Sequence, residues 1–197
     1  MSDPLEALAA QLRADGGLLE SAAADPADGA DRTRSAAVAA LPRHAVVGSA
    51  LEIAIEATRE AELLHHAPEL ARVFRTDDRD LALLAGDRLY ALGLARLAEG
   101  GWIDEVAILS DVVALVARLH ADAAWAIGPA IAGAPETGTG SPDDAATRAD
   151  ALWTCAVAAL GHGIGSPAAA LLRTVREGVL PASQDFIRAA GTPVTST

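Results

Sequence analysis

Lysine is absent from this chain of 197 residues, and all fifteen of its basic residues are arginine. Without lysine the chain can form no Schiff base with pyridoxal phosphate, and it has no phosphate-loop lysine. The formal charge of −12 also opposes binding to nucleic acid, which depends on the neutralisation of phosphates. These absences exclude two classes of site and argue against a nucleic-acid partner.

Cysteine and aromatic residues are scarce as well. The single Cys155 excludes an internal disulfide and any multi-cysteine metal site, and its apolar neighbours, Trp153 among them, predict a buried, unreactive thiol. Aromatic residues make up only 3% of the chain, and alanine and leucine supply most of its apolar half. This composition favours helices over sheets, and we expect neither a cofactor nor a bound metal ion.

Long apolar runs are also missing. The longest candidate, residues 106–134, is interrupted by Asp111, Arg118, His120 and Asp122. It therefore falls short of the roughly 18–20 residues that a membrane-spanning helix needs. The first residues lack the basic start and apolar region of a secretory signal. We expect a cytoplasmic protein without a membrane span.

Glycine and proline divide the chain into segments of helical length, and no sustained alternation indicates a strand. We expect one all-α domain over residues 1–197, built as a bundle of about seven or eight helices. The longest expected helices cover 44–66, about 77–99, 102–128 and 141–160. A shorter helix is expected to start at Ser166 and Pro167 and to reach about Val179. Non-helical parts are expected within 1–30, in an internal loop over 133–144 and in a flexible tail over 191–197.

Two motifs lie within residues 51–99: Glu56, Leu63, Leu64 and His65 stand at a fixed spacing, and Leu84-Ala85-Gly86-Asp87 follows about twenty residues later. This segment resembles the metal-binding half of the all-α isoprenoid (polyprenyl) diphosphate synthases. In that family a core helix carries E-x-x-H-x-x-x-L-x-H-D-D, and the next helix opens with L-A-G-D. The family-motif positions in this chain are Glu56, Leu63, Leu64, His65, His66, Gly86 and Asp87. The resemblance implies an isoprenoid-synthase-like helical bundle.

The chain departs from the family where the metal ligands belong. His66 and Ala67 stand in place of the first two aspartates, and Leu70 stands in place of the third. The second aspartate-rich motif is missing as well. Mg²⁺ prefers oxygen ligands, so the resemblance implies a scaffold without the ions that hold the substrate diphosphate. It implies a non-catalytic accessory subunit that supports chain elongation by a catalytic polyprenyl diphosphate synthase partner, or that forms a homodimer.

Two other functions remain open. The chain can be a stand-alone helical protein that binds an isoprenoid, another apolar ligand or another protein. It can also be a metal-dependent enzyme with relocated carboxylates, which requires the aspartates at 77, 78 and 80 to converge with one or two of the glutamates at 52, 56 and 60. We interpret Asp77 and Asp78 as part of a helix start, where Thr76 or Asp77 is the expected cap.

The glutamates Glu52, Glu56 and Glu60 recur at every fourth position and share one helix face. We interpret this face as solvated, with Arg59 softening the repulsion between the carboxylates. An inward row that faces a cavity or a partner's arginines is the alternative.

Several other polar and small residues carry weaker signals. Asp87 needs a hydrogen-bond partner, for which we expect Arg88 or Arg59. Glu62 and His65 form one E-x-x-H, but no second copy completes a di-iron site. His120 is interpreted as a satisfied buried or boundary histidine. Small residues at 85, 91, 93 and 95 leave room for either a prenyl chain or close helix packing.

Overall fold

The computed structural model describes residues 3–127, 142–178, 181 and 183–191. These residues form ten α-helices and two 3₁₀ helices, without a strand, and their one isolated β-bridge joins Ala23 to Phe74. The α-helices are α1 (Pro4–Asp15), α2 (Gly17–Ala22), α3 (Thr33–Ala39), α4 (His44–Val47), α5 (Ser49–His66), α6 (Arg79–Glu99), α7 (Ile103–Ile127), α8 (Pro142–His162), α9 (Pro167–Leu172) and α10 (Ser183–Gly191). The 3₁₀ helices are η1 (Pro68–Leu70) and η2 (Arg173–Glu177). The all-α prediction is confirmed for the described residues.

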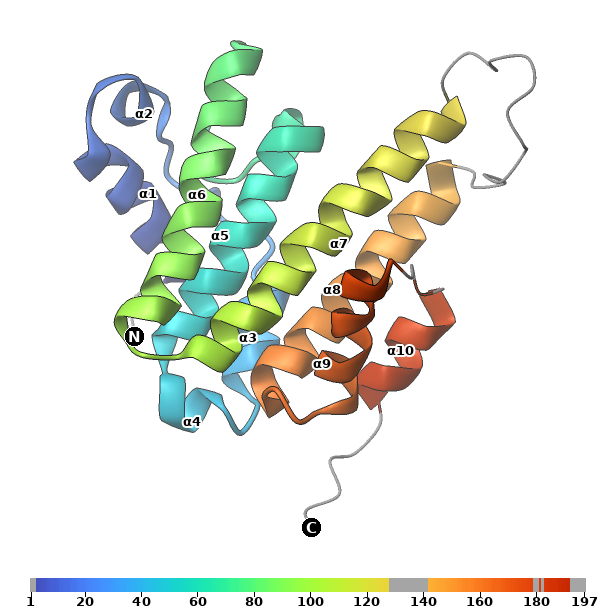
Figure 1. The fold of residues 1–197 in the computed structure, drawn as a ribbon. Coiled ribbons are helices and arrows are strands. Elements are labelled where there is room, and N and C mark those ends of the chain that lie inside the picture. Colours follow the sequence, from blue (N-terminus) through green and yellow to red (C-terminus); the bar gives the residue numbers. More distant parts are fainter. Residues whose placement is uncertain (1–2, 128–141, 179–180, 182, 192–197) are drawn as a thin grey trace.

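Two pairs of long helices organise the molecule. Figure 1 shows α5 and α6 side by side, and α7 and α8 as a second pair inclined to the first. Helices α6 and α7 follow each other through a turn at Gly100 and Gly101, from which they diverge. Helix α1 packs against α5, whereas α9 and α10 pack against α8. The α5–α6 pair is thus joined to the α7–α8 pair along a junction that α5 and α7 share.

The helix ends follow their local sequence, with one correction. The Asp78 side chain accepts hydrogen bonds from the backbone nitrogens of Asp80 and Leu81, so it caps α6. The predicted cap, Thr76 or Asp77, was therefore wrong by one or two residues. The Thr76 hydroxyl instead accepts a hydrogen bond from the Asp78 nitrogen, which fixes the turn before the cap.

The predicted continuous helix over 44–66 was also wrong, because the chain breaks at Gly48. This residue has φ 71° and ψ −152°, a conformation that is open to glycine and costly for side chains. The break separates the single turn of α4 from α5. Short helices of this kind, together with α2, explain why the described residues contain more helices than the seven or eight expected.

The predicted C-terminal helices differ in their bounds. Helix α9 ends at Leu172 and continues as the 3₁₀ helix η2, instead of reaching residue 179 as one α-helix. Helix α8 spans Pro142–His162, which agrees within two residues with the helix expected over 141–160 and shows that the expected loop over 133–144 extended too far. The other part of that loop, the expected helix end at 128–129 and the tail over 192–197 lie outside the described residues.

The interior consists of two apolar clusters. The α7–α8 core unites residues such as Leu109, Val112, Leu115, Leu152, Trp153 and Leu160 with Leu172 of α9 and Phe186 of α10. The α5–α6 core unites Leu5, Leu8 and Leu12 of α1 with Ala57, Leu64, Phe74, Ala85 and Leu89. Helix α5 contributes to both cores, so its polar residues between them lie at the junction of the two helix pairs.

Within the described part of the chain, no helix combines the length and the apolar character needed to cross a bilayer.

Candidate functional site

One face of the second half of α5 carries the polar residues that lie between the two cores. Arg59, Glu62 and His66 follow one another at intervals of three and four residues, so they share this face. Across the junction they meet His120 of α7 and Trp153 of α8. We name these five residues the junction cluster.

Glu62 is the centre of the junction cluster and only 2% of it is exposed. The indole nitrogen of Trp153 donates a hydrogen bond of 2.7 Å to Oε2, and the Arg59 guanidinium pairs with the same oxygen. The other oxygen, Oε1, lies 3.0 Å from Nε2 of His120. Three helices therefore satisfy one buried carboxylate, which is the condition for its burial.

The environment of Glu62 keeps its carboxyl ionised. Burial alone would raise its pKa, but the hydrogen bond from His120, the charge of Arg59 and the hydrogen bonds from Arg59 and Trp153 outweigh burial and lower the pKa below its usual value. The pKa of Tyr90 on α6 shifts in the opposite direction. Burial and the negative charges of Glu62 and Asp87 raise the pKa of its phenol, so Tyr90 remains neutral.

His66 lies at the rim of the junction cluster and stacks on His120. The two imidazole centroids are 3.6 Å apart and the rings are within 7° of parallel. Partial burial, electrostatic repulsion from His120 and the smaller effects of His65 and Arg79 lower the pKa of His66 to about 4, against the opposing effect of Glu62. Because part of His66 is exposed, water screens some of this effect, and the downward direction is the conclusion that follows from the stack.

The two segments that carried the sequence resemblance meet where α5 packs against α6. The His65 ring lies directly over Gly86, where an added Cβ would be 2.2 Å from its Cδ2 atom. Nε2 of His65 approaches Oδ1 of Asp87 to 3.2 Å, without the geometry of a hydrogen bond. Gly86 is therefore a position of close approach that only glycine fits without displacement of the histidine.

The partners predicted for Asp87 were wrong. Its side chain is 72% exposed and lies beside His65, so it does not depend on an arginine. Arg88 instead binds Asp15 at 2.7 Å and ties α6 to α1, and Arg59 is engaged by Glu62. Helix geometry explains the error, because neighbours in sequence point to different sides of α6.

The solvated face predicted for the α5 glutamates was also wrong. Glu56 and Glu60 are fully buried, and both bind Arg72 of the segment between η1 and α6, at 2.6 and 2.9 Å. Glu60 also accepts hydrogen bonds from the backbone nitrogens of Arg72 and Val73. The pKa of Arg72 rises, because the attraction of the two carboxylates outweighs the effect of burial. The row points inward, as the alternative interpretation held, but it meets Arg72 and His44 of the same chain rather than a cavity or a partner's arginines.

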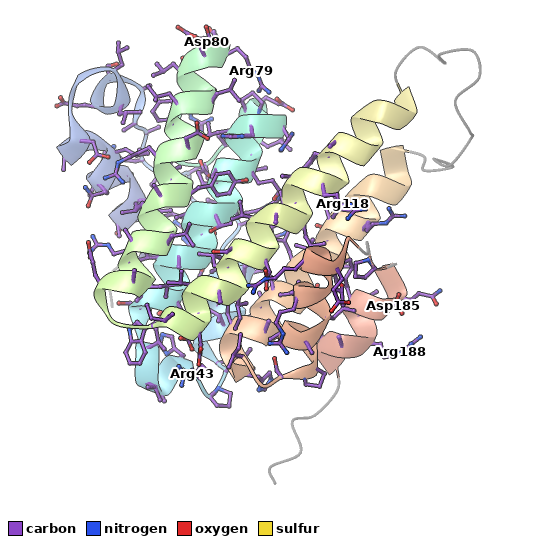
Figure 2. The ribbon with its side chains drawn as sticks, in the orientation of Figure 1. Arg43, Arg79, Asp80, Arg118, Asp185 and Arg188 are labelled. Atoms are coloured by element: carbon purple, nitrogen blue, oxygen red, sulfur yellow. The ribbon has the colours of Figure 1, made fainter. Side chains whose placement is uncertain are left out.

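Glu52 and the aspartates near the start of α6 belong to other parts of the molecule. Glu52 is buried and bonds to Nε2 of His44 at 2.6 Å, beside the short helix α4. Asp77, Asp78 and Asp80 are exposed, and Figure 2 places Asp80 and Arg79 at the end of the molecule remote from Arg43, which adjoins α4. The carboxylates required for a relocated metal site are therefore dispersed or already paired with cations.

Close helix packing accounts for the small residues that α6 directs inward. Ala85 and Gly93 are buried, and a Cβ on Gly93 would lie 3.1 Å from the Ala54 carbonyl oxygen of α5. Ala91 and Ala95 lie on the exposed side of α6. Cys155 is fully buried and its pKa is raised by burial to about 12, so the prediction of an unreactive thiol is confirmed.

Sequence reasoning missed the junction cluster as a unit. Glu62 was noticed only as half of an E-x-x-H motif, His120 as a boundary histidine, and Trp153 as a neighbour of Cys155. The available signal was the spacing of Arg59, Glu62 and His66 at intervals of three and four residues, which places them on one face of α5. Their partners on α7 and α8 lie 58 and 91 residues from Glu62, and no local pattern connects them.

In the described residues no group of three or more histidine, cysteine or acidic side chains is arranged to hold a metal ion. Comparison with known proteins assigns neither a family nor a fold: no protein-family model, no curated protein and no solved structure matches the chain.

Proposed function

We propose that this chain is an isoprenoid-synthase-like bundle that acts as a non-catalytic accessory subunit of a two-component polyprenyl diphosphate synthase. The observation that carries the proposal is the contact between its two family motifs. His65 ends the first motif on α5, and Gly86 and Asp87 form the second on α6, yet the histidine ring lies against both. A chance resemblance in composition does not require the two motifs to meet.

The contacts of α5 support the non-catalytic part of the proposal. His66, at the position of the first aspartate, is occupied by its stack on His120. Glu56 and Glu60 both pair with Arg72, and Glu62 is engaged by Arg59, His120 and Trp153. None of these buried carboxylates has an oxygen left over for Mg²⁺, which needs six ligands at short distances.

The outer side of α6 is the surface proposed for the catalytic partner. Leu84, Ala91, Ala95 and Ala98 are exposed and follow one another at intervals of seven, four and three residues, so they form one apolar stripe. Small side chains of this kind allow a second helix to approach closely. A partner that covers the stripe would support elongation from outside this chain.

Affinity capture of the tagged chain from its own cells, followed by a Mg²⁺-dependent prenyl-elongation assay, tests the proposal. We expect a stoichiometric partner with two D-D-x-x-D motifs, and elongation activity that neither chain has alone. Ala95→Arg should abolish capture of that partner. Ala10→Arg, the same change at an exposed position of α1, should leave capture intact.

Other outcomes would contradict the accessory role. If this chain changed neither the rate nor the product length of the captured partner enzyme, the accessory role would be contradicted. A chain that purifies alone with a bound isoprenoid would favour the stand-alone binding protein instead. Mg²⁺-dependent activity of the isolated chain would favour the enzyme with relocated carboxylates.

A further inference from the structure

The stack of His66 on His120 lies where α5 and α7 meet between the two cores. Further along their length α6 and α7 diverge, as Figure 1 shows, so this end of α7 lacks the support of α6. The stack and the bond between Glu62 and His120 hold α7 to α5 at this place. Polar contacts that depend on protonation therefore join the two halves of the molecule.

The charged groups around His66 come from three helices. On α5 they are Glu62 and His65, on α6 Arg79, and on α7 His120. The Arg79 guanidinium is held at this place by the carbonyl oxygens of Leu64 and His65. Glu62 alone favours a charge on His66, and its oxygens are already engaged by Arg59, His120 and Trp153. A proton on His66 would thus meet more repulsion than attraction.

Water nevertheless reaches His66, because the residue is exposed at the rim of the cluster. Protonation requires no prior opening of the molecule. A positive charge on this ring would lie 3.6 Å, centroid to centroid, from the imidazole that is paired with Glu62. The stack is favourable for a neutral His66 and unfavourable for a charged one.

We propose that the His66–His120 stack is a proton-operated latch, which holds α7 against α5 while His66 is neutral and releases it when His66 takes up a proton from solvent. Release separates the α5–α6 pair from the α7–α8 pair at this end of the junction. It exposes Glu62 and the indole of Trp153 to water. The latch does not depend on the accessory-subunit proposal, because all of its groups belong to this chain.

The latch can be tested by nuclear magnetic resonance between pH 7.5 and pH 4. In the wild-type chain we expect the indole signal of Trp153, identified by Trp153→Phe, to shift together with the imidazole signals of His66. Amide exchange in the α7 segment around Leu115–His120, corrected for its intrinsic pH dependence, should accelerate at least about tenfold, which corresponds to one pKa unit of coupling. His66→Phe keeps a flat ring without a titrating group and should abolish both changes.

Three results would overturn the latch. The first is a His66→Phe variant with the same pH response as wild type. The second is an α7 segment whose exchange is unchanged while His66 titrates, and the third is an equal acceleration at all amides, which would mean global acid unfolding. If His66→Phe does not fold, His66→Gln is read in the same way. His162→Gln, on the remote end of α8, should behave as wild type.

Discussion

Single residues of α5 show how this fold tolerates buried charge. Glu52, Glu56, Glu60 and Glu62 are all buried. Glu52 bonds to His44, Glu62 pairs with Arg59, and Glu56 and Glu60 share Arg72. Removal of one partner would leave an uncompensated charge in an apolar environment, which costs far more than the pair contributes. The arginines that are buried with these glutamates are therefore expected to be sensitive positions.

Arg72→Ala should lower the free energy of unfolding by about 3–5 kcal/mol, because it leaves Glu56 and Glu60 buried without a cation. Urea denaturation at pH 7 measures the loss. Arg13→Ala breaks a pair with Asp25 whose side chains are 40% and 85% exposed, and should cost at most about 1 kcal/mol.

A second substitution separates the charge from the packing of Arg72. Glu60→Gln removes one of the two carboxylates, so it should reduce the cost of Arg72→Ala when the two changes are combined. Strictly additive losses in this double-mutant cycle would argue against the buried ion pair as the cause.

Gly86→Ala should lower the free energy of unfolding by about 1–3 kcal/mol, because the new methyl group overlaps the His65 ring and forces it to move. Thermal and urea unfolding measure the change. Gly165→Ala is the matched control, since an added Cβ there meets nothing within 4 Å. Equal stability of the two variants would show that His65 relaxes without cost and that the contact is not tight.

At the scale of helices, local signals and tertiary demands agree in some places and conflict in others. Helix α1 begins at Pro4 behind its Asp3 cap and buries Leu5, Leu8 and Leu12, as its spacing predicts. The segment over 44–66 has helical composition throughout, yet the chain turns at Gly48. The turn lets α4 leave the axis of α5, so that His44 folds back to reach Glu52.

Gly48→Ala should destabilise the protein by about 1–3 kcal/mol, because alanine at φ 71° and ψ −152° is strained. If a continuous helix over 44–66 were accessible to the variant instead, its helical circular dichroism signal would increase and its stability would fall little. Unfolding curves and far-ultraviolet spectra at 25 °C distinguish the two outcomes, with Gly165→Ala again as the control.

At the scale of the whole molecule, the junction cluster links stability to pH. The folded-state pKa of Glu62 lies below 4.5, the ordinary value of a glutamate side chain. The ionised Glu62 therefore contributes fully to the free energy of unfolding above pH 4.5, and this contribution is lost as the pH falls through the folded-state pKa. Protonation of His66 also destabilises the folded chain, over a higher pH range. Folding lowers the pKa of His66 from 6.5 to about 4, so proton uptake favours the unfolded chain between these two pH values.

Glu62→Gln should lower stability most at neutral pH, and its difference from wild type should shrink as the pH falls below 4.5. Urea unfolding at several pH values from 7 to 3 measures this difference. Glu6→Gln, on an exposed position of α1, controls for the removal of one carboxylate. A difference between Glu62→Gln and wild type that stays constant over this range would show that the charge of Glu62 does not stabilise the junction.

The sequence by itself determined the all-α class, the positions of most long helices, the absence of disulfides and the burial of Cys155, because these follow from composition and short-range spacing. It also placed Glu56 and His65 on one helix and Gly86 and Asp87 on the next. Only the tertiary structure decided which side of α5 was buried. Arg72 reaches Glu60 across a turn, and His120 and Trp153 reach Glu62 from distant helices. A helix face that the sequence predicts to be solvated is therefore buried, because these partners supply the charge and the hydrogen bonds that water would otherwise provide.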